Sequence, residues 1–223
     1  MEIMVQGNAK KCYLPDEVRI NFDFYTKGET YSEALENGIK NVEEFIEKIL
    51  MSLNFSKNDL KTKSFNIVEE KKYDYELKKE IKLGYSYRQS ASVKFDYSLE
   101  MVALFIEKIK EMANPPKCDI LFGIKEEETI KNSMLADAYE EAIKKAEVIA
   151  KAANKSLKDC IKVDFKPFDT ALLSGTNLNS KNFLCEEAAY KLASNSVSEM
   201  ITNTFTPEDI ELEETIYCLW ITE

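Results

Sequence analysis

The sequence predicts an α+β fold in which long helices pack on a mixed or antiparallel sheet. Three observations predict it: segments whose apolar residues alternate with polar ones, segments whose apolar residues recur at helical spacing, and the order of the two kinds. That order is β-α-β-β-α-β, the split βαβ arrangement, followed by a further long helix and two strands. We expect a single domain over residues 1–223, with the β-α-β-β-α-β part at 2–125 and the rest at 126–223.

The first strand and helix of this order have clear local signals. Apolar and polar residues alternate from Val18 to Phe24, as in a half-buried strand, and a proline-aspartate pair marks a turn before it. Thr30 and Glu33 form a capping-box pattern, and apolar residues then recur at helical spacing as far as Leu53. A strand followed by a long amphipathic helix is therefore predicted.

A long hairpin and a second helix come next. We expect a strand around 61–70, a polar tip at 71–79 and a long strand over about 80–97. At ~3.3 Å per residue the second strand exceeds the usual ~17–20 Å, so we expect the hairpin to project beyond the sheet as an arm. A helix over 99–113, ended by an Asn-Pro-Pro turn, and a strand at 118–124 complete this part.

A third helix is predicted from about Glu126 to Ala153. Apolar or small residues recur in it every four positions, at Ile130, Met134, Ala138, Ala142, Ala146 and Ala150. The glutamates of its first turn suit the helix dipole, and consecutive glutamates point in different directions, so no metal site is expected there. Two strands, at 160–165 and 210–222, flank an irregular stretch at 166–206.

The amino-acid composition argues against several classes of partner and of active site. A net charge of −10, from 40 acidic and 30 basic residues, disfavours nucleic acid and anionic membranes as partners. No histidine occurs, which excludes the commonest hydrolase and metalloenzyme sites. The five cysteines show no CxxC spacing and are odd in number, so we expect reduced thiols. With no membrane span and no apolar signal region, a soluble cytoplasmic protein is expected.

We predict no catalytic, cofactor-binding or metal-binding residue. The six glycines form no phosphate-binding motif, and a serine triad is impossible without histidine. The candidate surface is an aromatic and basic set on the hairpin arm: Tyr73, Tyr75, Tyr85, Tyr87 and Arg88. Tyrosine and arginine are enriched at protein interfaces, which favours an interface over single-stranded nucleic acid; a plain solvated hairpin is the alternative.

Several stretches also share their order and spacing with a known family. They are Val5-Gln6-Gly7-Asn8-Ala9 with Leu14-Pro15-Asp16-Glu17-Val18, Tyr31 to Leu35, Asp59 to Ile67, Leu83-Gly84-Tyr85, and the alanine series from Ala138 to Ala150. Through them the chain resembles the SIMPL-domain family, over roughly residues 2–163 and the final strand. Bacterial members of that family are often described as oxidative-stress-defence or immunogenic periplasmic proteins. The usual glycine before the last strand is replaced here, and 166–206 does not match.

The resemblance implies an α+β domain prone to ring-like or cage-like homo-oligomers, a link to a stress response and no catalytic residues. Our principal hypothesis is therefore a non-catalytic protein whose partner is itself. One alternative is a ligand-binding protein or enzyme that uses residues 166–206 as a lid, because loops of that length are often functional. The other is an adaptor that holds a protein partner at the hairpin tip.

Overall fold

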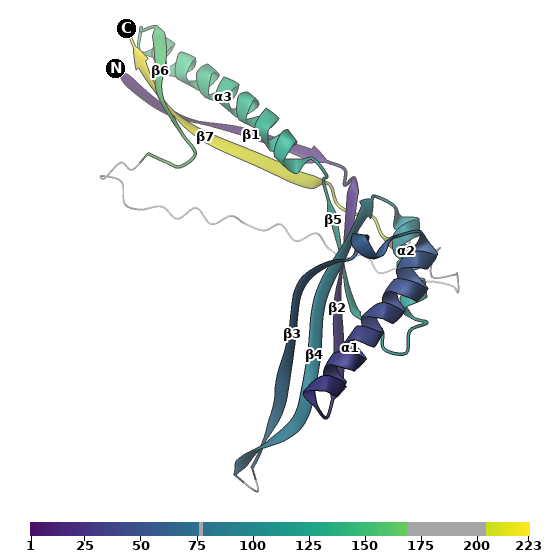
Figure 1. The fold of residues 1–223 in the computed structure, drawn as a ribbon. Coiled ribbons are helices and arrows are strands. Elements are labelled where there is room, and N and C mark those ends of the chain that lie inside the picture. Colours follow the sequence, from purple (N-terminus) through teal and green to yellow (C-terminus); the bar gives the residue numbers. More distant parts are fainter. Residues whose placement is uncertain (76–77, 169–203) are drawn as a thin grey trace. The chain divides into compact units, whose positions relative to one another are not determined.

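The computed structural model describes residues 1–75, 78–168 and 204–223 (Figure 1). Its described parts form two compact units. The terminal unit consists of residues 1–14, 125–168 and 209–223, and the central unit consists of residues 15–124 with 204–208. The strands are β1 (Glu2–Tyr13), β2 (Glu17–Gly28), β3 (Lys61–Asp74), β4 (Lys79–Asp96), β5 (Lys117–Gly123), β6 (Leu157–Asp164) and β7 (Ile210–Thr222). The α-helices are α1 (Tyr31–Phe45), α2 (Leu99–Ile109) and α3 (Glu127–Ala152).

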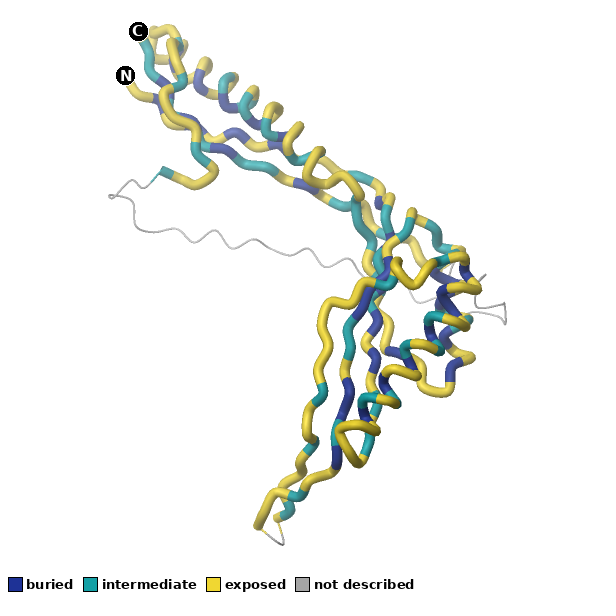
Figure 2. Tube along the Cα trace, in the orientation of Figure 1, coloured by how far each residue is buried: buried dark blue, intermediate teal, exposed yellow. Residues whose placement is uncertain are grey.

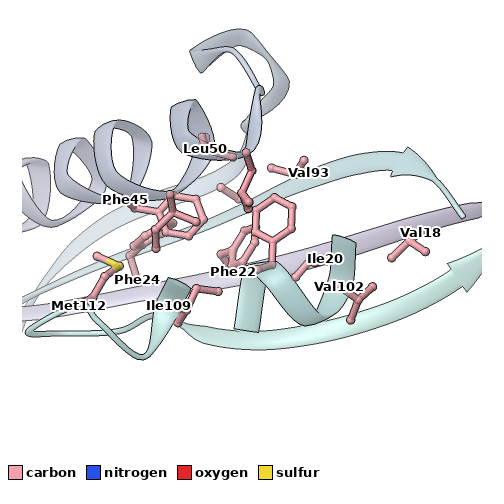
Figure 3. Packing of buried hydrophobic residues seen from close by; sticks show 14 of the residues in the cluster. Val18, Ile20, Phe22, Phe24, Phe45, Leu50, Val93, Val102, Ile109 and Met112 are labelled. Carbon is pink, nitrogen blue, oxygen red and sulfur yellow. The ribbon is translucent and has the colours of Figure 1, made fainter. Parts of the chain in front are cut away.

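The central unit is an antiparallel sheet in the order β3-β4-β2-β5 with α1 and α2 packed in one core. Alternate residues of β2 point into this core, where the Phe22 and Phe24 rings lie 4.6 and 5.2 Å from the ring of Phe45 on α1 (Figure 3). At the start of α1 the Thr30 hydroxyl accepts a hydrogen bond from the Glu33 backbone N–H, as predicted. The Glu33 carboxylate accepts from the backbone N–H of Glu29, one residue before the expected position.

The predicted β-α-β-β-α-β order is confirmed as β2-α1-β3-β4-α2-β5. The hairpin arm is present as well, because β4 pairs with β2 only from Tyr85 to Asp96 and pairs with β3 alone beyond that point. The predicted tip at 71–79 was too long, since β3 continues to Asp74. Cross-strand pairing overrides the polar composition of those residues.

The terminal unit is a three-stranded antiparallel sheet in the order β1-β7-β6, with α3 packed against β1 and β7 (Figure 1). The alanine series of α3 is buried against alternate residues of both strands, as the buried stripes in Figure 2 show. Gly7 lies where β1 and α3 are in close contact, since a Cβ at that position would stand 1.9 Å from the Ala138 carbonyl oxygen. The small residues of both elements therefore permit this packing.

The α+β fold is confirmed, with two antiparallel sheets rather than one. The long helix and the two strands after it are also present. Strand β1 was not among the predicted elements, although Ile3, Val5, Gly7 and Ala9 alternate with exposed residues. That the whole chain folds as one domain stays a prediction.

Candidate functional site

The five predicted interface residues do not lie together. Tyr73 and Tyr75 form an edge-to-face pair at the end of the arm, with ring centroids 5.2 Å apart. Together with Ile81 and Leu83 they line a surface hollow of about 430 Å³. The end of the arm therefore presents aromatic and apolar side chains to solvent.

The other three residues are divided by the alternation of β4. Tyr85 packs on Tyr31 with ring centroids 5.9 Å apart, and the ammonium group of Lys82 donates a hydrogen bond to its hydroxyl. Arg88 points to the opposite face of the sheet, where it pairs with Glu70 at 3.0 Å. Residues of odd and even number face opposite sides of a strand, so no single surface collects them.

Tyr87 is a core residue rather than a surface residue. Its side chain is buried, and its ring lies over Gly38 of α1 and 5.2 Å from the ring of Phe65. Its hydroxyl donates a hydrogen bond to Gln89. Of the five residues only Tyr73 and Tyr75 remain together as a candidate interface, because Tyr85 and Arg88 lie on opposite faces of β4. An interface role for any of them stays a prediction.

An apolar edge lies on the terminal unit along β6. Within the described part of the chain β6 pairs with β7 alone, so its other edge has no partner strand there. Ile161 and Val163 of β6, and Phe165 directly after it, are 51%, 49% and 67% exposed. We call these three residues the β6 patch.

The opposite edge of the same sheet, along β1, is closed by two charged side chains of α3. The Glu141 carboxylate accepts a hydrogen bond from the backbone N–H of Asn8 at 2.5 Å, and the Lys145 ammonium donates to the carbonyl oxygen of Gln6 at 2.9 Å. Glu141 and Lys145 also pair with each other at 3.0 Å. The Asn8 N–H and then Lys145 hold the pKa of Glu141 below its ordinary value. These contacts occupy backbone groups that an added strand would need.

Apolar side chains lie beside this closed edge. Val148 and Ile149 of α3 are 68% and 43% exposed, and with Val5 they line an open hollow of about 580 Å³. We call Val148 and Ile149 the α3 patch. The terminal unit therefore presents two different apolar patches, one at β6 and one on α3 beside the β1 edge of the sheet.

A polar pocket of about 480 Å³ lies in the central unit, between α1, the end of β2 and the turn after α2. We call it the asparagine pocket; its lining residues are Tyr25, Thr26, Lys27, Asn37, Lys40, Asn41, Glu44, Ala113 and Asn114. No sequence pattern considered above predicted this pocket. The available signal was the pair of asparagines four residues apart on the buried side of a helix.

Three further findings concern the functions considered above. Across residues 1–75, 78–168 and 204–223, no three Cys, Asp or Glu side chains gather closely enough to hold a metal ion. No helix in these ranges combines the length and apolarity needed to cross a bilayer. The proposed lid at 166–206 lies largely outside the described residues, because the structure does not describe 169–203.

The chain matches a family of known proteins. The family model described as SIMPL, protein of unknown function (DUF541), matches residues 3–217. The matched range includes residues of both compact units. No curated protein matches the chain.

Proposed function

The chain belongs to the SIMPL family, a family described as of unknown function, and we propose that it is a non-catalytic protein that self-associates head to tail. In this arrangement the β6 patch of one copy packs against the α3 patch of the next. The observation that carries the proposal is the exposure of apolar side chains at β6 and on α3 beside the β1 edge of the same sheet. The occupant of each patch is a second copy, because each patch is apolar and the same chain carries both.

The two edges differ in what they can bind. At β1 the Glu141 and Lys145 side chains already form hydrogen bonds with backbone groups of the strand edge. A contact there therefore uses the side chains of Val148 and Ile149. At β6 both apolar side chains and the strand edge are available among the described residues. Two unlike surfaces make a heterologous contact, which forms a ring when the rotation between copies closes.

The energy of one contact favours a closed assembly. Full burial of a Val, Ile or Phe side chain contributes about 1.5–3 kcal/mol, so scaling by the exposed fractions gives about 2.5–5 kcal/mol for the β6 patch and about 1.5–3 kcal/mol for the α3 patch. Association costs at least about 4 kcal/mol in lost freedom of motion, so one such contact is weak. In a closed ring each copy makes two contacts, whereas an open pair holds only one contact in total. The ring is therefore more stable than the open pair.

The test is the solution mass of the full chain by analytical ultracentrifugation. We expect wild type to sediment as a multiple of 25.7 kDa. Val148→Asp, and Val163→Asp combined with Phe165→Asp, should each reduce it to monomer. Met51→Asp, at an exposed apolar residue of the central unit, is the matched control and should leave the mass unchanged.

Mixing the two patch variants tests the head-to-tail arrangement. Each variant keeps the patch that the other lacks, so an equimolar mixture can form a dimer with one intact contact. Because one contact is weak, we expect this dimer only at high protein concentration, where each variant alone stays monomeric. A strictly monomeric wild type would refute self-association. An unchanged mass for Val148→Asp would refute the head-to-tail contact.

The exposed Tyr73–Tyr75 pair favours a second candidate function, the docking of a different protein at the arm. Aromatic side chains at an exposed position are typical anchors of protein interfaces. Replacing both tyrosines with serine should then remove a partner from affinity purifications while the solution mass stays that of wild type. An unchanged partner list would argue against this function.

A further inference from the structure

We propose that the asparagine pocket binds a small oxyanion, a carboxylate or phosphate group, through Lys40 and Asn41. The pocket belongs to the central unit, so the proposal is independent of self-association through the terminal unit.

The pocket exists because β5 is shorter than β2. Strand β5 pairs with β2 only from Glu17 to Asp23, although β2 continues to Gly28. Beyond that point asparagine side chains replace the missing strand: Asn114 donates to the Tyr25 carbonyl and Asn37 donates to the Lys27 carbonyl, each at 3.0 Å. The carbonyl acceptors on this stretch are therefore paired. Residues of a strand present N–H and C=O on the same side, so the N–H groups of Tyr25 and Lys27 face the same edge.

Asn41 is an unusual residue for the wall of this pocket. It is only 6% exposed, and its Nδ2 group has no hydrogen-bond partner among the described residues. A buried donor without an acceptor costs folding free energy, which favours a bound acceptor. The terminal torsion of asparagine is soft and roughly two-fold, so a half-turn exchanges the two ends of the amide. That rotation would present an N–H donor to the pocket.

The charges on the lining favour an anion. The only acidic side chain of the lining, Glu44, pairs with Lys48 at 2.9 Å. Lys40 has no ion-pair partner in the described parts of the chain. Lys27, by contrast, lies 5.7 Å from the Tyr25 ring centroid, and its charge acts on Glu70, a residue outside the lining. The Lys40 ammonium and an amide donor therefore line a pocket whose carboxylate is already neutralised.

Size and total charge limit the ligand. A volume of about 480 Å³ lies within the ~300–1,000 Å³ of small-molecule sites. The net charge of −10 opposes a large polyanion such as nucleic acid. One carboxylate or phosphate group on a small molecule matches the Lys40 ammonium and one amide donor.

The test is an NMR titration of the ¹⁵N-labelled full chain, separately with inorganic phosphate and with succinate, at constant ionic strength. We expect saturable shifts of the Asn41 side-chain amide and of the Tyr25 and Lys27 backbone amides. Lys40→Ala should raise the dissociation constant about tenfold, the effect of losing one charge-assisted contact. Lys110→Ala, at an exposed lysine outside the pocket, is the matched control and should bind as wild type.

The two titrants distinguish the source of the oxyanion, since the one that saturates at lower concentration identifies the preferred group. The proposal is overturned if neither titrant gives a saturable shift at the pocket amides. It is also overturned if Lys40→Ala binds as tightly as wild type, because the ammonium group would then contribute nothing. Backbone spectra of each variant establish that the fold is retained.

Discussion

Gly7 is a position where the packing of the terminal unit leaves no room for one added methyl group. A Cβ at residue 7 would stand 1.9 Å from the carbonyl oxygen of Ala138 and 2.9 Å from the Cβ of Ala142. Cβ contacts under 3.0 Å essentially do not occur, so β1 and α3 must separate by about 1 Å in Gly7→Ala. The nearest atom belongs to the helix backbone, which cannot turn aside as a flexible side chain does.

The cost follows from that separation. A gap of 0.5–1 Å forfeits about a quarter to a half of the dispersion energy between facing atoms. Overpacking a core typically costs about 1–3 kcal/mol, and we place Gly7→Ala at the upper end, about 3 kcal/mol, because the clash is with backbone. For a chain of this length that corresponds to a fall in Tm of about 6–12 °C.

The assay compares the urea and thermal unfolding of Gly7→Ala with that of Gly123→Ala. Gly123 is the matched control, since its added Cβ would meet nothing closer than 3.8 Å. Adding Ala142→Gly to Gly7→Ala should not restore stability, because the Ala138 carbonyl remains. A Gly7→Ala protein as stable as Gly123→Ala would refute the close approach of β1 and α3.

Three further predictions concern both units. Gly38→Ala should lower the free energy of unfolding by about 1–3 kcal/mol, because its Cβ would stand 2.2 Å from the Tyr87 ring. In a double-mutant cycle, the added change Tyr87→Leu should recover part of this loss. Strictly additive effects of the two substitutions would contradict the contact. The pKa of Glu141 is lowered by the Asn8 N–H, so its stabilising contribution is complete above about pH 4.3 and is lost as pH falls through the lower folded-state pKa. The stability difference between wild type and Glu141→Gln should therefore shrink toward pH 3, and a difference independent of pH would count against this hydrogen bond. Burial raises the pKa of the Cys218 thiol to about 11, so iodoacetamide at pH 8 should alkylate it far more slowly in the folded chain than in urea; equal rates by mass spectrometry would disprove its burial.

The predictions made from local sequence patterns were the accurate ones. The alternation from Val18 to Phe24, the Thr30 cap and the alanine series of α3 all act between residues a few positions apart, and each was confirmed. Strand β1 was missed because Gly7 and Asn8 have low strand propensity. Gly7 is favourable there only because α3 lies against it.

The candidate sites depended on partners distant in sequence. Alternation places Tyr87 and Arg88 on opposite faces of a strand, but only the packing of α1 decides that Tyr87 is the buried one. The asparagine pocket depends on where β5 stops pairing with β2, which no local pattern records.

By itself the sequence determined the type and order of most helices and strands, since periodicity and caps depend on neighbours within one or two turns. Only the tertiary structure decided that β1 pairs with β7 at the other end of the chain, and thereby which sheet edges carry the β6 and α3 patches. The physical reason is that a strand edge stays open, and a pocket stays empty, only where no other segment of the chain packs. That depends on the register of segments that lie far apart in the sequence.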